Sequence, residues 1–220
     1  KELCRGTILR EGYPRNSIFF DQEHGRLLKE VLGYQGCQLS VYMPTFRGHT
    51  DDVEGDTYVE QVRSYLEVID KGMQDDQILL LKLHPLVQKG LDLDNYRHIR
   101  PFPSELDTYD VLNACDVLIT DYSSVMYDFA NTGRKIILFA YDLEDYMGHR
   151  GMYEDIRSYP FPIAVTPEEV LSELQEPGGG ADREFLDKYC TFDRQKATRN
   201  ICRHVLLGKY LCQEHKMPVT

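Results

Sequence analysis

The sequence predicts an α/β domain in which a parallel β-sheet is covered by helices on both faces. Two observations lead to this fold class. Apolar stretches of strand length recur along the chain, at residues 38–43, 77–83, 117–120 and 135–139. Between them lie longer segments whose apolar residues recur every three or four positions, as in an amphipathic helix. Short buried strands that alternate with helices are typical of parallel sheets with both faces covered.

The size and composition suit one such domain. The chain has 220 residues, of which 42% are hydrophobic, and no apolar run approaches the length of a membrane-spanning helix. A formal net charge of −11 argues against a nucleic-acid binder, because binding to phosphates needs a basic surface. The sequence starts at Lys1 without an initiator Met or an apolar signal segment, so it reads as a piece of a longer protein.

Cysteine usage indicates free thiols in a reducing cytoplasm. The six cysteines have irregular spacing and include no C-x-x-C pair. Cys202, His204, Cys212 and His215 lie near one another in the sequence, in a stretch with a helical pattern. Residues two apart on a helix point to nearly opposite sides, so Cys202 and His204 cannot easily share a zinc ion. We therefore expect no metal site there.

The first elements follow from turn and capping signals. Ser17 is expected to be the N-cap of a helix that runs to residue 32, and Gly33 and Gly36 end it. The stretch 38–43 then predicts the first strand.

The middle of the chain repeats this alternation. Residues 58–73 carry apolar side chains at helical spacing, and residues 77–83 form an apolar run of strand length. A short strand is expected near 98–102. Ser104 is expected to cap a helix through residue 113, with Asp107 completing a capping box. The remaining elements are predicted as strands 117–120, 135–139 and 163–165, and as helices 123–131, 167–175, 182–189 and 194–211.

Ligands of parallel α/β sheets bind beyond the carboxyl ends of the strands. The loops at that edge are expected to be 45–47, 84–85, 101–103 and 120–124. In the last of them, the start of a helix offers unpaired backbone N–H groups and a dipole that favours an anion, and Ser123 and Ser124 add hydroxyl donors. This predicts a phosphate site. The alternative is that Asp121 or Ser123 only caps the helix.

Two further residues at this edge have a functional and a structural interpretation. His84 could face a phosphate or act as an acid or base, or it could simply bond to the backbone at a strand end. Arg47 is a favoured partner for phosphate, yet surface arginines are ordinary. Taken one at a time these signals are weak, and their joint placement at one edge is stronger.

At this point the residues show a family resemblance. The strings Met43-Pro-Thr-Phe-Arg47, Leu83-His-Pro85 and Asp116-Val-Leu-Ile-Thr-Asp-Tyr-Ser-Ser124 resemble those of the CDP-glycerol glycerophosphotransferases of bacterial teichoic acid synthesis. The resemblance implies a GT-B architecture of two Rossmann-like domains. Residues 1–220 would be the second, nucleotide-donor-binding domain, with C-terminal helices at about 182–212. The N-terminal domain, which supplies other catalytic groups and the acceptor surface, would lie outside this sequence.

The resemblance also implies an activity and roles for residues. Family members transfer glycerol phosphate from CDP-glycerol to a lipid-linked or polyol-phosphate acceptor and release CMP. His84 would face the diphosphate as the essential residue. The other residues would form the rest of the donor pocket, with phosphates held by Thr120, Asp121, Ser123, Ser124, Thr45 and Arg47 and the base bordered by Pro101 and Phe102. We expect no cofactor, although dependence on a divalent cation is left open.

Other functions stay open at this stage. The donor could be CDP-ribitol or a CMP-sugar, or the chain could be a nucleotide-binding module without catalysis. The isolated domain is expected to bind nucleotide and turn over nothing. The full-length protein is expected to be cytoplasmic and peripheral on the inner face of the bacterial membrane, with membrane contact only outside this segment.

Overall fold

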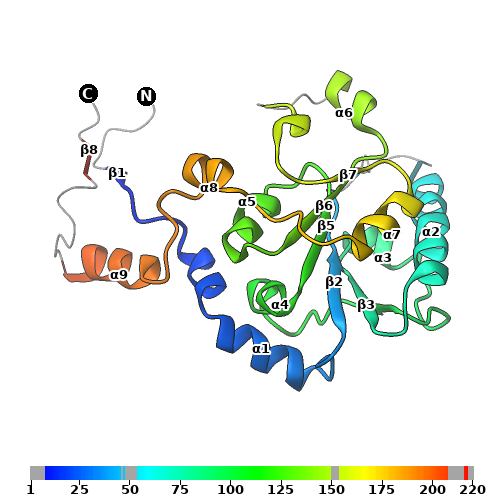
Figure 1. Cartoon of the computed structure of the whole chain (residues 1–220), viewed down its shortest axis with the longest axis horizontal. Coiled ribbons are helices and arrows are strands. Elements are labelled where there is room, and N and C mark those ends of the chain that lie inside the picture. Colours follow the sequence, from blue (N-terminus) through cyan, green and yellow to red (C-terminus); the bar gives the residue numbers. More distant parts are fainter. Residues whose placement is uncertain (1–7, 46, 48–53, 150–153, 208–215, 218–220) are drawn as a thin grey trace.

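A single sheet of parallel strands forms the centre of the molecule (Figure 1). The computed structural model describes residues 8–45, 47, 54–149, 154–207 and 216–217. The strand order is β4-β3-β2-β5-β6-β7. These strands are β2 (Gln38–Tyr42), β3 (Gln77–Leu81), β4 (Ile99–Pro101), β5 (Val117–Thr120), β6 (Lys135–Phe139) and β7 (Ile163–Ala164). The predicted fold class and all the predicted strands are confirmed.

The connections reverse direction in the middle of the sheet. The chain runs outward from β2 through β3 to β4, and then returns to the other side of β2 to form β5. Tyr42 is consequently paired with Leu81 on one side and with Ile119 on the other. The point where the strand order reverses is the usual ligand crevice of a doubly wound sheet. Here that point lies between the carboxyl ends of β2 and β5.

Alternate residues of each strand face opposite sides of the sheet. Leu80 and Leu118 face one hydrophobic cluster, whereas Leu81 and Ile119 face the other. The first face is covered by η1 (Pro14–Phe20), α4 (Thr108–Ala114) and α5 (Val125–Phe129), and α1 (Gln22–Val31) packs on α4. The second face is covered by α2 (Glu54–Gly72) and α7 (Pro167–Gln175) (Figure 1).

The helix α2, predicted from its amphipathic pattern, shows how the spacing of apolar residues determines which helix face packs on the sheet. In α2, Val62, Leu66 and Ile69 are all buried against the sheet, at the spacing of one helix face. Each such side chain contributes roughly 1.5–3 kcal/mol through burial. The helix therefore has one orientation on the sheet that its sequence favours strongly.

The two ends of the described chain lie together at the left of Figure 1, above α9 and on the side of α8 that is away from the sheet. The two-residue strand β1 (Ile8–Leu9) pairs antiparallel with β8 (Lys216–Met217), and η1 packs on α9. The sequence pattern did not predict this pair, because two residues are too short to show a period. The remaining elements are α3 (Pro85–Gln88), η2 (Ala130–Thr132), α6 (Leu143–His149), η3 (Ile156–Ser158), α8 (Arg183–Tyr189) and α9 (Ala197–Leu207).

Two predicted helix caps are wrong. Ser17 lies inside the 3-10 helix η1, which begins at Pro14, and its hydroxyl contacts Thr198 instead. Proline fixes its own φ angle and favours the first helical position, so the turn starts earlier than predicted. The N-cap of α1 is Asp21, which accepts a hydrogen bond from the backbone of His24.

The second wrong cap is Ser104. The helix α4 begins only at Thr108, and its N-cap is Asp107, whose carboxylate accepts from the backbone of Tyr109. A carboxylate next to the helix start satisfies the dipole better than a more distant hydroxyl. The predicted N-terminal turn of this helix is thus irregular backbone.

The predicted helix 123–131 and the last predicted helix both begin later than expected. The first consists of α5 followed by the 3-10 helix η2, and Gly133 ends it with a φ angle of 68°. The last helix, predicted over 194–211, is α9 from Ala197, and its predicted final residues 208–211 lie outside the described residues.

Candidate functional site at the carboxyl edge of the sheet

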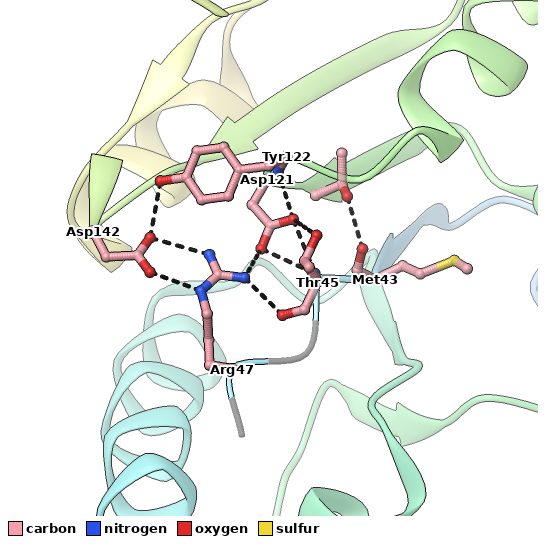
Figure 2. A network of polar contacts seen from close by, with 7 residues as sticks. Met43, Thr45, Arg47, Asp121, Tyr122 and Asp142 are labelled. Carbon is pink, nitrogen blue, oxygen red and sulfur yellow. Dashed lines mark hydrogen bonds and ion pairs between the residues drawn. The ribbon is translucent and has the colours of Figure 1, made fainter. Parts of the chain in front are cut away.

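The loops that leave the carboxyl ends of β2, β5 and β6 are joined by one group of polar and charged side chains that is largely shielded from solvent (Figure 2). We name this group, which consists of Thr45, Arg47, Asp121 and Asp142, the Arg47 clamp. Each member follows its strand by a few residues, so the parallel register brings all of them to one edge. The clamp bridges the point where the strand order reverses.

Asp121 is the acceptor at the centre of the clamp. Its side chain is only 1% exposed. It accepts hydrogen bonds from the backbone N–H of Thr45 at 2.9 Å and from the Thr45 hydroxyl at 2.8 Å. It also accepts from Nη1 of Arg47 at 2.5 Å. Through these bonds Asp121 fixes the loop after β2 to the end of β5.

Arg47 extends the clamp to the loop after β6. Its Nε and Nη2 donate to the two carboxylate oxygens of Asp142 at 2.7 and 3.1 Å, and Nη1 donates to the carbonyl of Thr45 at 2.7 Å. Burial alone would lower the pKa of Arg47, but the hydrogen bond to Asp142 and the charge of Asp121 raise that pKa above its ordinary value. One buried cation is therefore held by two carboxylates.

Aromatic rings enclose the Arg47 guanidinium. Its central carbon lies 5.1 Å from the ring centre of Tyr122, 5.7 Å from Tyr141 and 5.6 Å from Tyr146. Tyr122 and Tyr146 stack at 3.7 Å, and the Tyr122 hydroxyl donates to Asp142. Burial and this hydrogen bond raise the pKa of Tyr122. The rings exclude water from the ion pairs, which strengthens them.

The predicted phosphate turn follows directly from the clamp. Thr120 is completely buried, and its hydroxyl donates to the carbonyl of Met43, so this side chain joins β5 to β2. Ser123 is half-buried, with the backbone N–H of Val125 at 3.5 Å from its hydroxyl. Ser124 is exposed and makes no side-chain capping bond to α5. Asp121 accepts from the loop after β2 and from the backbone of Tyr122, so capping by Asp121 is not observed.

The neighbouring strand ends carry the other predicted residues. His84 is exposed, and its carbonyl accepts from the backbone N–H groups of Val87 and Gln88 at the start of α3. Pro101 is exposed at the end of β4, whereas Phe102 is buried. Lys82 places its ammonium 4.2 Å from the ring centre of Phe102. All of the predicted loops therefore lie along one edge, as the parallel topology requires.

Sequence reasoning missed two features of this region. Asp142 was not assigned a role, although its place just after a buried strand was the available signal. Asp128 of α5 is also buried, and accepts from Arg15, Asn16 and Tyr109 at 2.9, 2.9 and 2.7 Å. Asp128 lies inside the predicted helix 123–131 and was assigned no role from the sequence. Both carboxylates have partners far away in the sequence, which no local pattern reveals.

Metal ligation and membrane insertion were also assessed. Within the described residues, no three His, Cys, Asp or Glu side chains are grouped so as to hold a metal ion. Cys202 and His204 lie on α9, and Cys212 and His215 lie outside the described residues. The helices of the described ranges are all too short or too polar to span a bilayer.

A doubly wound parallel sheet whose polar strand ends meet at its reversal point is a Rossmann-like domain. The family model described as CDP-Glycerol:Poly(glycerophosphate) glycerophosphotransferase matches residues 2–207. The chain belongs to this family. The resemblance noted from the sequence is thereby confirmed.

Individual relatives agree with this assignment. A teichoic acid poly(glycerol phosphate) polymerase of Staphylococcus epidermidis is 32% identical over 210 residues, which cover 88% of this chain and 29% of the relative. A teichoic acid glycerol-phosphate transferase of Staphylococcus aureus is 30% identical over 216 residues, covering 92% of this chain and 55% of the relative. The chain thus spans about half, or less, of the length of the relatives that it matches.

Solved structures show the same fold. A variant of the wall teichoic acid polymerase TagF matches with a TM-score of 0.74 and 28% identity, over 90% of this chain and 51% of that chain. A TagF variant soaked with CDPG matches with a TM-score of 0.72, again at 28% identity and the same coverage. The fold predicted through the resemblance, the C-terminal half of a GT-B architecture, is confirmed.

Proposed function

We propose that this chain is the donor-binding domain of a glycerophosphotransferase that acts on CDP-glycerol. The observation that carries the proposal is the convergence of the strand-end loops at the reversal point of the sheet, in a chain of this family. The reaction would join an acceptor hydroxyl to the phosphorus that carries glycerol. The bond from that phosphorus to the bridging oxygen would break, and CMP would leave.

The proposal divides the edge residues into two groups. His84, Ser123 and Ser124 are exposed or half-buried, and we assign them to contact with the diphosphate. Phosphoryl transfer depends mainly on positioning and on stabilisation of charge, which donors of this kind supply. Pro101 and the loop that contains it would border the base.

The members of the Arg47 clamp form the second group. Thr45, Arg47 and Asp121 direct their polar atoms at one another and at Asp142, with distances of 2.5–3.1 Å. We therefore propose that they act on the donor indirectly, by holding the turn at 120–124 in place. Thr120 acts in the same way through its bond to Met43.

The relatives are longer than this chain. The acceptor site and the other catalytic groups are therefore proposed to lie in a further part of the protein. We propose that residues 1–220 act with a further domain that binds a polyol-phosphate acceptor. We propose that the assembled enzyme works at the inner face of the bacterial membrane. The reaction as proposed uses no cofactor.

Calorimetry with the 220-residue chain tests the donor-site proposal. CMP and CDP-glycerol should both bind, and His84→Ala should weaken binding of CDP-glycerol while circular dichroism of the protein stays unchanged. Lys71→Met is a suitable control, because Lys71 is exposed and lies in the last turn of α2, at the end of the helix away from the candidate site. A folded chain that gives no heat with millimolar CMP or CDP-glycerol would refute the assignment.

CDP-ribitol is a second candidate donor. A teichoic acid poly(ribitol-phosphate) polymerase of Bacillus spizizenii is 30% identical over 185 residues, which cover 77% of this chain and 28% of the relative. Competition between CDP-glycerol and CDP-ribitol for the same chain discriminates between the two donors. The donor that binds with the lower Kd is the one that we would assign to this site.

A further inference from the structure

A diphosphate donor needs positive charge at its site, and among the residues that the structure describes, most cations at the carboxyl edge are already compensated. Arg47 faces Asp121 and Asp142, so the clamp holds one cation against two carboxylates. Arg15 is paired with the buried carboxylate of Asp128 at 2.9 Å. Neither arginine brings net positive charge to the edge. The charge that meets the phosphates must have another source.

Arg100 of β4 does not supply that charge either. Its guanidinium donates to the carbonyls of Tyr96, Ile99 and Arg97, at 3.2, 2.8 and 2.9 Å. These bonds fold the side chain back along its own loop. The donors of Arg100 are thus directed to its own segment of the chain.

Lys82 differs from these arginines. Its ammonium lies over the ring of Phe102, and across the described ranges no carboxylate lies within ion-pair distance of it. Asp107, the N-cap of α4, is the acid whose charge acts on it from further away. Burial lowers the pKa of Lys82, and Asp107 offsets this only in part. Within the described part of the chain, the ammonium is therefore partly stripped of water and has no counter-ion at ion-pair distance.

The register places Lys82 beside the predicted phosphate turn. Lys82 donates its backbone N–H to the carbonyl of Tyr42, and Thr120 donates its hydroxyl to the carbonyl of Met43. Because Leu81 and Ile119 both pair with Tyr42, the next residues Lys82 and Thr120 stand level on the same face of the sheet. They are two strand spacings apart, roughly 10 Å. A lysine side chain and a diphosphate can span that gap together.

We propose that Lys82 binds a phosphate group of the nucleotide donor, between the end of β3 and the turn at Ser123–Ser124. This inference rests on the proposed function and adds to it the cation that the site requires. A half-buried ammonium without a counter-ion is costly, and an incoming phosphate offsets that cost. Phe102, which is buried under the ammonium, holds the lysine stem in place.

The test measures nucleotide binding by variants of the 220-residue chain. Lys82→Met keeps an unbranched stem over Phe102 and removes the charge, whereas Lys82→Arg keeps the charge. Lys82→Met should weaken binding of CDP-glycerol and CMP at least about tenfold in calorimetry, and Lys82→Arg should stay within a few-fold of the wild type. Cytidine, which has no phosphate, should bind both variants as it binds the wild type when followed by saturation-transfer NMR.

Lys71→Met is the matched control, because it removes the same charge from an exposed lysine at the far end of α2. If the wild type binds CDP-glycerol and folded Lys82→Met binds it equally well, the role of Lys82 is refuted and the donor site stands. If the wild type binds neither nucleotide, the proposed function fails, and this inference with it. Should Lys82→Met not fold, Lys82→Gln takes its place with the same expected loss.

Discussion

Arg47 is where the sequence and the structure suggest different roles for one side chain. An arginine at a strand end of a phosphate-binding sheet is a common phosphate ligand, and from the sequence Arg47 was placed among the residues that hold the phosphates. The structure directs all of its guanidinium nitrogens to Asp121, Asp142 and the carbonyl of Thr45. The side chain is only 12% exposed. Its environment is that of a structural cation.

This environment predicts a large stability effect. Arg47→Met should lower the free energy of unfolding by about 3–5 kcal/mol, because Asp121 would be left buried without its cation. Urea denaturation followed by circular dichroism measures the change. Adding Asp121→Asn should recover part of the loss, since a neutral amide tolerates burial better than an unpaired carboxylate.

Arg26→Met provides the control for Arg47→Met. Arg26 is 59% exposed, and among the described residues it pairs with Glu23 and Glu30 on its own helix. Exposed pairs of this type contribute little to stability, so Arg26→Met should leave the free energy of unfolding nearly unchanged. Equal losses for the two arginines would contradict the clamp.

The residue scale also shows what sequence reasoning could not find. Ser123, Ser124 and His84 were identifiable because a strand end or a helix start is visible in the local pattern. Asp142 was not, since its partner Arg47 lies 95 residues away in the chain. Lys82 was overlooked for a related reason. Its importance depends on which other cations are already paired, and pairing is a property of the folded chain.

At the scale of the element, apolar patterns were the reliable signal and caps were not. The strands β5 and β6 and the helix α7 have the boundaries that their patterns predict. Apolar runs decide which segments become buried, and burial contributes most of the stability. A cap is a choice between nearby polar residues that differ by about 1 kcal/mol. Pro14 starts η1 ahead of Ser17, and Asp107 rather than Ser104 is the N-cap of α4.

The packing of α1 on α4 yields a prediction about a glycine. A Cβ atom on Gly25 would lie 2.3 Å from the backbone oxygen of Asn113. Gly25→Ala should therefore destabilise the protein by about 1–3 kcal/mol through overpacking, although alanine favours helix. Thermal unfolding of the variant measures the change.

Gly148→Ala is the matched comparison. Gly148 lies inside α6, and an added Cβ would have nothing within 4 Å. Its replacement should be neutral or should stabilise the protein by up to about 1 kcal/mol. A melting temperature for Gly25→Ala that is as high as that of Gly148→Ala would show that α1 and α4 can move apart freely.

At the scale of the whole molecule, Asp193 joins the last part of the chain to the first. Its carboxylate accepts from the backbone of Tyr13 at 2.8 Å and from the amides of Asn16 and Asn131 at 2.8 and 2.9 Å. One side chain in the connection between α8 and α9 therefore contacts both η1 and the segment after α5. No local sequence pattern indicates this contact, because its partners are far apart in the chain.

Loss of this carboxylate should loosen α9 from the rest of the fold. Asp193→Ala should cost about 1–3 kcal/mol, because the amides of Asn16 and Asn131 and the backbone N–H of Tyr13 each lose one acceptor. Trypsin should then cleave faster after Arg199 and Arg203 of α9, as followed by mass spectrometry. Asp187→Ala removes a carboxylate from α8 that is 72% exposed, and it should leave the cleavage rate unchanged. Unchanged cleavage in both variants would indicate that other contacts hold α9.

The reversal of strand order has a further consequence, for the order in which the molecule folds. Gln38 of β2 and Gln77 of β3 are 39 residues apart, whereas Leu39 and Asp116, which join β2 to β5, are 77 residues apart. Contacts between distant segments form slowly, so one half of the sheet can assemble before the other half joins it. The candidate site takes residues from both halves and exists only once they have joined. A bound nucleotide should consequently slow unfolding far more than it speeds folding.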